Sequence, residues 1–297
     1  QPVAVEDPTF PGVLDALYRA GARVIGLPAG AGLDPDRLEH VVRTHRPAMV
    51  YLIPTHHNPT GLVMPAGHRR RVARLAAEHP GTLFVDDMTL AELPLVEGPL
   101  GDGPPPPPLA AFAPRQANLV SVGSLSKLYW GGLRTGWIRA SPGLIARAAA
   151  AKAAADLGSA AFQQAITAAL LNDGHDGIVA WRREWLRARH DALTGALRAA
   201  LPGWTWPQPQ GGLTLWVRVG GDSSAFAQAA LRHGVAVVPG RLLSASGDAG
   251  GAGEYLRLAF TQAPGVLARS VPKLASTAAA STAQARPMPP RSARRSA

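Results

Sequence analysis

The first half of the chain alternates short apolar runs with helix-length amphipathic segments, and this alternation restricts the folds open to it. Ala48–Ile53 is apolar from end to end, and Thr82–Val85 is nearly so; Pro65–His79, between them, has helical periodicity. Strands that are apolar on both faces are typical of parallel sheets covered by helices on both sides. The sequence therefore predicts an α/β architecture with a mostly parallel sheet.

The same alternation begins at residue 1 and continues past the middle of the chain. Asp34 is a suitable N-cap for one predicted helix, with Pro35 in its first turn. The other predicted elements are strands at Val3–Val5 and Arg23–Leu27, a helix at Pro11–Ala20, a strand–loop–strand unit over Asn118–Arg139, and helices at Pro142–Ala155, Ala160–Leu171 and Gly177–Ala200.

After Pro202 the pattern changes to that of a smaller α+β domain. Strands are predicted at Leu213–Val219, Val235–Val238 and Tyr255–Phe260, with a helix at Ser223–His233. We therefore expect three parts: a large domain over residues 1–172, a connecting helix and small domain over 173–275, and a disordered tail rich in Ala, Ser, Thr, Pro and Arg over 276–297. Because the chain opens inside a predicted strand, we also expect that the N-terminal part of the large domain is missing.

Composition excludes several classes of function. The net charge of +10 comes almost wholly from arginines, which are spread over predicted helix faces, so it indicates a compositional bias rather than a nucleic-acid groove. No apolar run approaches the length of about 18 residues that a membrane helix needs, and no signal peptide is visible. The absence of cysteine excludes disulfides and fits a cytoplasmic protein.

Lys127 is the first candidate for chemistry, because an amine is the group that attacks a carbonyl cofactor. It is one of three lysines and closes the run Val120–Lys127, so it leaves the end of a predicted buried strand. Ligands of parallel sheets bind beyond the carboxyl ends of the strands. Ser124 and Ser126 precede it, and Arg134 follows seven residues later; hydroxyls and a guanidinium suit a phosphate. The alternative is a surface lysine on a glycine loop.

Two further polar groups follow predicted strands. His57-Asn58-Pro59-Thr60-Gly61 comes after Ala48–Ile53, and an Asn before Pro is held extended so that its amide can point into a crevice; the alternative is a plain tight turn. The pair His56 and His57 lacks a carboxylate at metal-ligand spacing, which argues against zinc. Asp86-Asp87 follows Thr82–Val85, and a buried acid there needs a partner such as a protonated ring nitrogen, unless it is a helix cap or a solvated turn residue.

Together these segments resemble the class I and II aminotransferases of fold type I, which depend on pyridoxal 5'-phosphate (PLP), over about residues 1–275. His57–Gly61, Ser124–Lys127 and Gly132–Gly136 occur in the family's order and at its spacing. The resemblance implies an aspartate aminotransferase-like fold, with a large-domain sheet of the seven-stranded type. It also implies a homodimer whose substrates are an amino acid and a 2-oxo acid.

The resemblance also implies a role for each site residue. Lys127 would hold PLP as a Schiff base and later carry the substrate proton. Three residues would contact the PLP ring: Phe10 would stack on it, Asn58 would bind its hydroxyl and Asp86 its nitrogen. The phosphate would be held by Ser124, Ser126 and Arg134. The substrate would be bound by Asn58 and by Arg257, which would hold its carboxylate. No metal is implied.

The chain departs from the family pattern at two places. Thr89 stands where the family usually has Tyr, three residues after the ring-nitrogen acid, which puts cofactor tuning in doubt. The small-residue loop that cradles the phosphate is also absent, and we expect it to precede residue 1.

A finer resemblance leaves a second function open. The opening Val5–Gly12, the stretch Val85–Leu93 and Gly211–Trp216 look like the aminotransferase-like effector domain of GntR-type (MocR) transcriptional regulators. There PLP is a sensed ligand, and nucleic acid is bound only by a winged-helix domain outside this segment. The first hypothesis is thus an enzyme, the second a sensing module, and the third a truncated pseudo-enzyme that binds nothing.

Overall fold

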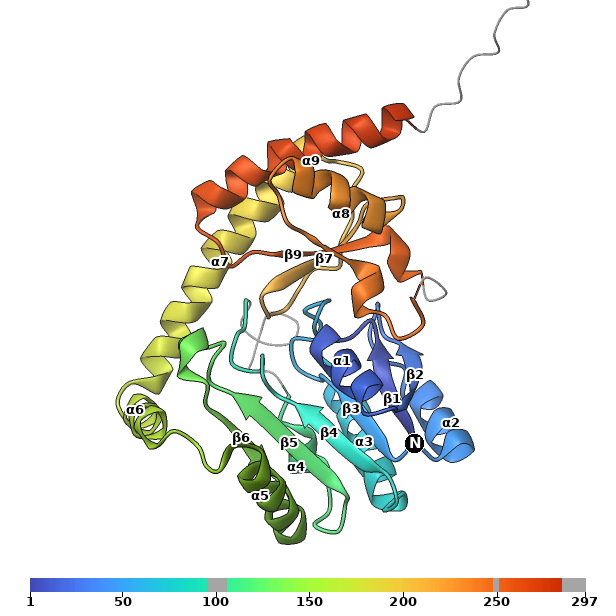
Figure 1. Ribbon diagram of the computed structural model, residues 1–297, viewed down its shortest axis with the longest axis vertical. Coiled ribbons are helices and arrows are strands. Elements are labelled where there is room, and N and C mark those ends of the chain that lie inside the picture. Colours follow the sequence, from blue (N-terminus) through green and yellow to red (C-terminus); the bar gives the residue numbers. More distant parts are fainter. Residues whose placement is uncertain (96–105, 248–250, 285–297) are drawn as a thin grey trace, which may run out of the picture.

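The computed structural model describes residues 1–95, 106–247 and 251–284. These residues form two sheets, a large one from the first half of the chain and a small one from the second, as Figure 1 shows. The large sheet has the strand order β2-β1-β3-β4-β5-β6. Its strands are β1 (Pro2–Asp7), β2 (Arg23–Pro28), β3 (Met49–Leu52), β4 (Leu83–Asp87), β5 (Leu119–Ser124) and β6 (Gly136–Arg139).

The predicted α/β fold is confirmed, with one difference in the strand count. The pairs among β1 to β5 are all parallel, and β6 pairs antiparallel with β5. The described residues supply six strands to this sheet, whereas we expected a sheet of the seven-stranded type.

Helices cover both faces of the large sheet. Leu38, Val72 and Phe84 belong to the apolar cluster under α2, α3 and α4, whereas Leu14, Val5 and Val85 belong to the cluster under α1. The helices are α1 (Pro11–Arg19), α2 (Pro35–His45), α3 (Ala66–Glu78), α4 (Leu109–Phe112), α5 (Pro142–Asp156) and α6 (Ala161–Asn172). The predicted cap of α2 is confirmed, because the Asp34 side chain accepts a hydrogen bond from the Asp36 N–H.

The second half of the chain packs around the small sheet, whose order is β7-β9-β8 and whose pairs are antiparallel. In Figure 1 the long helix α7 runs along one side of the molecule from α6 to the small sheet. The elements are α7 (His175–Ala200), β7 (Thr214–Arg218), α8 (Ser223–Arg232), β8 (Val238–Pro239), β9 (Tyr255–Ala259) and α9 (Pro264–Gln284).

Helix α9 corrects our expectation for the tail. Residues 276–284 are helical, and Thr277 is buried against the rest of the small domain although we expected disorder from residue 276. Leu267, Val271 and Leu274 of α9 join the same apolar cluster as α7, and the helix continues from this packed part into a segment whose composition alone favours disorder. Residues 285–297 lie outside the described part. The division at residues 172 and 173 stays a prediction.

Candidate functional site

A pocket of about 260 Å³ lies between the two sheets, where the carboxyl ends of the parallel strands face the small domain. The large domain contributes the amine, the amide and the acid, and the small domain contributes a guanidinium. The lining residues are Phe10, Ile53, Asn58, Asp87, Thr89, Leu90 and Lys127 from the first half, and Leu213, Thr214, Arg257, Ala259 and Thr261 from the second. Four predicted site residues, Phe10, Asn58, Lys127 and Arg257, are thus together.

Lys127 lies in the turn that follows β5, as the sequence predicted, and its side chain is exposed to the pocket. The turn is tied to the start of α7 from two directions. Tyr129 pairs through its hydroxyl with His175 Nδ1 at 2.6 Å, and Arg182 donates to the carbonyl oxygen of Lys127 at 3.3 Å. The other two lysines lie on the surface, where Lys152 pairs with Asp156 on α5. Of the three lysines, Lys127 is therefore the one that lines this pocket, and its role in carbonyl chemistry stays a prediction.

The segment His57–Gly61 forms a turn after β3 that brings Asn58 to the pocket. Its amide oxygen accepts a hydrogen bond from Arg257 Nη1 at 3.4 Å, which joins residues 199 positions apart. The turn rests on the Gly211-Gly212 segment: a Cβ on Gly211 would lie 2.2 Å from the His56 ring, and Gly212 has a φ of +87°. Asn58 and Arg257 thus meet in one pocket although they come from different halves of the chain.

The two acids at the end of β4 face different surroundings. Asp87 lines the pocket; its carboxylate accepts from the Tyr51 hydroxyl and from the Thr89 N–H. Asp86, the residue that the sequence singled out, is buried and accepts from the Leu109 N–H at 2.9 Å; it does not line the pocket. Successive side chains of a strand point to opposite faces, which separates the two acids. The role of Asp86 stays a prediction, and Asp87 is a second candidate.

The predicted phosphate ligands lie beside the pocket rather than in its lining. Ser124 ends β5 and accepts from the Ser126 N–H at 3.3 Å, and Ser124 pairs with Gly136 across the β5–β6 ladder. Arg134, with a φ of 52°, lies in the turn before β6 and borders a separate hollow with Lys152 and Thr167. No contact between Arg134 and Ser124 or Lys127 is present among the described residues. Their role in holding phosphate remains a prediction.

Sequence reasoning missed two buried charged residues behind the pocket. Arg69 is fully buried on α3 and donates to the carbonyl oxygens of Met64, Pro54 and Pro107. The sequence had grouped it with exposed helix-face arginines. Helical periodicity could have indicated that Arg69 is buried, because Val72 and Ala76, three and seven residues further on, belong to the apolar face of α3.

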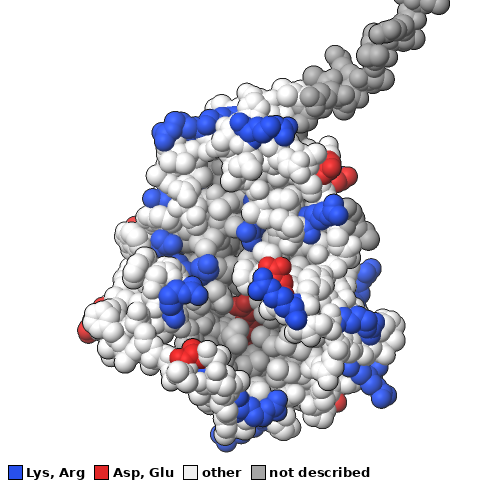
Figure 2. Space-filling view, in the orientation of Figure 1, with Lys and Arg blue, Asp and Glu red and all other residues white. Residues whose placement is uncertain are grey.

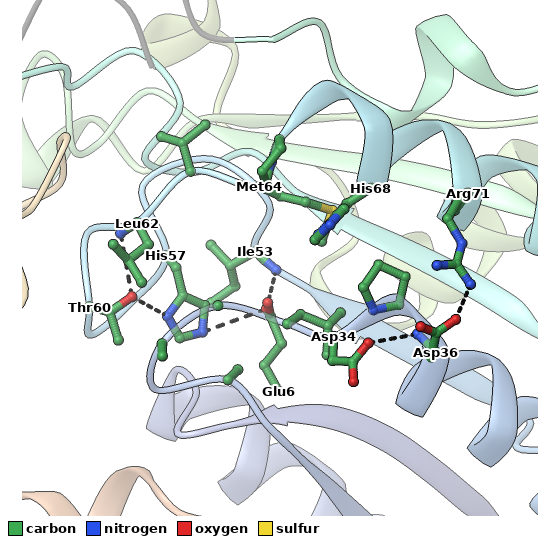
Figure 3. Close-up of a pocket in the computed structure, with 17 residues that line it drawn as sticks. Glu6, Asp34, Asp36, Ile53, His57, Thr60, Leu62, Met64, His68 and Arg71 are labelled. Carbon is green, nitrogen blue, oxygen red and sulfur yellow. Dashed lines mark hydrogen bonds and ion pairs between the residues drawn. The ribbon is translucent and has the colours of Figure 1, made fainter. Parts of the chain in front are cut away.

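Glu6, the second missed residue, is buried at the end of β1. It lies in the wall of another pocket, of about 440 Å³, which is shown in Figure 3. Its Oε2 accepts from the Ile53 N–H at 2.6 Å. Burial, with smaller contributions from Asp87 and Asp86, raises the pKa of Glu6 to about 8. Glu6 is therefore protonated at neutral pH in the folded chain.

This raised pKa predicts a pH-dependent stability. The folded state holds a proton that the unfolded state releases at a pKa of 4.5, so the contribution of Glu6 to the free energy of unfolding falls as pH rises from 4.5 to about 8. Between pH 5 and pH 8.5, the free energy of unfolding of the wild type should fall by on the order of 3 kcal/mol more than that of Glu6→Gln. Denaturant titrations across this range measure the difference. Glu78→Gln, at an exposed position on α3, is the control. If the free energies of unfolding of the wild type and of Glu6→Gln differ by the same amount at every pH, the prediction is wrong.

The charges support a small-molecule site rather than a large charged surface. Figure 2 shows Lys and Arg side chains in separate groups on this face, around a central hollow that contains acidic side chains. No helix within the described ranges is both long enough and apolar enough to cross a membrane. In the same part of the chain, His, Asp and Glu side chains form no cluster of three that could bind a metal ion.

Comparison with known proteins agrees with this geometry. The model of the family "Aminotransferase class I and II" matches residues 1–265. The chain is 32% identical over 266 residues to 2-aminoadipate transaminase of Thermus thermophilus, covering 87% of this chain and 64% of that protein. It is 31% identical over 218 residues to the uncharacterized HTH-type transcriptional regulator YisV of Bacillus subtilis, covering 72% of this chain and 43% of the regulator.

The fold agrees with a solved structure as well. The crystal structure of α-aminoadipate aminotransferase from Thermus thermophilus, complexed with N-(5'-phosphopyridoxyl)-L-leucine, matches with a TM-score of 0.86 at 29% identity. The match covers 96% of this chain and 72% of that one. The chain thus spans less than two thirds of the curated relatives described above. The family match over most of the chain, together with a lysine, an asparagine and an arginine converging on one pocket, establishes that the chain belongs to the class I and II aminotransferase family.

Proposed function

We propose that the protein is a PLP-dependent aminotransferase that acts on an amino acid and a 2-oxo acid. The observation that carries the proposal is the pocket in which Lys127 lies with Asn58, Phe10 and Arg257. An amine, an amide donor, an aromatic ring and a guanidinium are the groups that a pyridine aldehyde and an amino-acid carboxylate require. The solved relative bound to a phosphopyridoxyl amino acid supports the same cofactor.

The pocket residues fit PLP and its substrate in distinct roles. When bound, PLP supplies an electron sink for the bond that is broken at the substrate Cα. Arg257, partly buried and without an acid partner among the described residues, is placed to bind the substrate carboxylate. Asn58 would donate to the ring hydroxyl, and Phe10 would cover one face of the ring. Lys127 would hold the cofactor and then carry the proton from Cα.

Burial affects which groups can carry charge in this site. Desolvation lowers the pKa of Arg257, and it raises the pKa of Asp86 to about 6. The Leu109 N–H and Arg69 oppose this rise, and the resulting pKa of about 6 leaves Asp86 mostly ionised at neutral pH. An ionised acid at the strand end is what a protonated ring nitrogen needs.

A half-reaction tests the enzymatic proposal. The protein loaded with PLP should show the absorbance of lysine-bound cofactor, and a substrate amino acid should convert it to that of pyridoxamine phosphate. We expect this with at least one member of a panel that contains 2-aminoadipate, aromatic, acidic and aliphatic amino acids. Lack of PLP binding would refute the cofactor assignment. Binding without discharge by any of these amino acids would favour the second candidate.

The second candidate is a PLP- and amino-acid-sensing module of a GntR-type (MocR) regulator. The similarity to an HTH-type regulator and the presence of Thr89 in the pocket favour it. A threonine hydroxyl is shorter than the tyrosine hydroxyl usual in the family, so cofactor binding could persist with weakened turnover. In this case DNA would be bound by a domain outside this segment.

We also propose that the protein is a cytoplasmic homodimer. Several large apolar side chains between the turn before β6 and the first turns of α7 are exposed, including Trp130 (69%), Ile138 (51%), Phe162 (75%) and Trp181 (55%). Exposed apolar patches of this kind usually mark a protein interface. The absence of cysteine supports a reducing compartment. Sedimentation of the purified protein tests the dimer.

A further inference from the structure

Two loops bring ligand-binding residues to the Lys127 pocket, and one buried histidine lies between them. The β1–α1 loop (residues 8–10) carries Phe10, and the β3–α3 loop (residues 53–65) carries Asn58. His57 belongs to the second loop, yet its ring is directed at the end of β1, where the first loop begins (Figure 3). Its side chain is 5% exposed, so solvent does not explain the position of the ring.

Each ring nitrogen of His57 faces a different partner. Nδ1 lies 2.9 Å from Thr60 Oγ1, and Nε2 lies 3.6 Å from Glu6 Oε2. Thr60 Oγ1 can donate its hydroxyl proton to Nδ1 while it accepts the Leu62 N–H at 3.3 Å. In that tautomer the proton of the neutral ring lies on Nε2, the nitrogen that faces Glu6. Burial keeps the ring neutral, since it lowers the pKa of His57 to about 4 against a smaller, opposing effect of the Pro8 backbone.

The Glu6 carboxyl extends this connection to the pocket wall. It accepts from the Ile53 N–H, and Ile53 lines both the pocket of Lys127 and the pocket in Figure 3. Glu6 and His57 therefore line the pocket in Figure 3, and Glu6 contacts the backbone at the start of the β3–α3 loop, which borders both cavities. Asn58 is the next residue after His57, so a rotation of the His57 backbone moves the amide of Asn58 directly.

The contact between His57 and Glu6 is polar and buried, and one of its atoms lacks a hydrogen-bond partner. His57 Nε2 has no partner within hydrogen-bond geometry among the described residues, and 3.6 Å is too long for a direct bond. Core packing alone would be served better by an apolar pair, because a buried polar atom without a partner destabilises the fold. A cost of this kind next to ligand-bearing loops points to a role in the site.

We propose that Glu6 and His57 are positioning residues that hold the Phe10 loop and the Asn58 loop at a fixed separation around the Lys127 pocket. This inference rests on the proposed function, because Phe10 and Asn58 act on the PLP ring. Misplacement of a ligand-bearing group by about 1 Å can cost on the order of 10²-fold in a site, so the connection between the loops matters even though neither residue touches the cofactor.

The test compares substitutions at two buried histidines in the PLP-reconstituted chain. His57→Leu removes both polar contacts and keeps most of the volume, and His57→Gln restores an amide that reaches toward Glu6. His190→Leu is the matched control, because His190 on α7 is also 5% exposed and its Nε2 also lacks a partner within the described structure. The readouts are the dissociation constant of PLP, the pH midpoint of bound-cofactor absorbance, and the melting temperature without PLP.

We expect His57→Leu to weaken PLP binding about tenfold and to shift the absorbance midpoint, as loss of a group that orients a ligand-binding residue does. His57→Gln should recover part of the affinity, and His190→Leu should lower the melting temperature without changing either PLP readout. Combined with Asn58→Ala, His57→Leu should add little further loss, because it acts through Asn58.

The outcomes separate this inference from the proposed function. If the wild type does not bind PLP, both fail. If the wild type binds PLP and His57→Leu has the affinity and absorbance midpoint of the wild type, only the positioning role fails. Equal effects of His57→Leu and His190→Leu, or full additivity of His57→Leu with Asn58→Ala, would also overturn it.

Discussion

Replacing Lys127 with alanine should abolish the discharge of bound cofactor by amino acids and prevent covalent attachment of PLP. The chain has three lysines, and Lys127 is the one that lines the pocket with Asn58 and Arg257. Loss of its proton transfer alone should slow the half-reaction about 10²–10⁴-fold, and loss of the covalent link adds to this. Stopped-flow absorbance with a substrate amino acid measures the rate.

Borohydride reduction followed by mass spectrometry measures the covalent link separately. The wild type should retain the mass of the reduced cofactor on the peptide that contains Lys127, whereas Lys127→Ala should retain none. Lys152→Ala is the matched control, because Lys152 pairs with Asp156 on the surface of α5 and should label like the wild type. Cofactor mass on Lys152 or Lys273 in the wild type would contradict the assignment.

The second large effect concerns the acids at the end of β4. Asparagine cannot stabilise a protonated ring nitrogen by charge, so substitution of the acid that pairs with the ring should slow the half-reaction by about 10²–10³-fold. We expect Asp86→Asn to show this loss, since Asp86 precedes Thr89 by the three residues that the family spacing requires and is ionised near neutral pH.

Asp87→Asn is the matched comparison, because Asp87 lines the pocket but is held by Tyr51 and by the Thr89 N–H. It should slow the half-reaction by less than Asp86→Asn does. The reverse order of rates would assign the ring nitrogen to Asp87. If both variants react as fast as the wild type, neither acid of β4 pairs with the ring nitrogen of the cofactor.

Local patterns were sufficient for the elements and for most of the chemistry-bearing positions. Apolar runs and helical periodicity predicted the alternation of strands and helices in the large domain, because burial on one or both faces is written into consecutive residues. The motif residues Asn58 and Lys127 were found since each follows a strand, and parallel strands end at a common edge.

Other features depend on contacts that no local pattern contains. Asp86 and Asp87 are adjacent and chemically identical, and only the twist and neighbours of β4 decide which of them reaches a cavity. Helical periodicity places Arg69 on the apolar face of α3, but its guanidinium can be buried there only because three carbonyl oxygens from outside the helix converge on it. Its burial is a tertiary property.

The sequence by itself determined the α/β class and the family, because these follow from periodicity and from residue types at fixed spacing, and it singled out Lys127 as the lysine expected to bind the cofactor. The tertiary structure decided which side chains share a pocket: it joined Asn58 to Arg257 across the two domains and placed His57 against Glu6. It also packed α9 on α7, and α9 continues to residue 284. Such outcomes depend on long-range packing, whose free energy exceeds the local preferences of the segments involved.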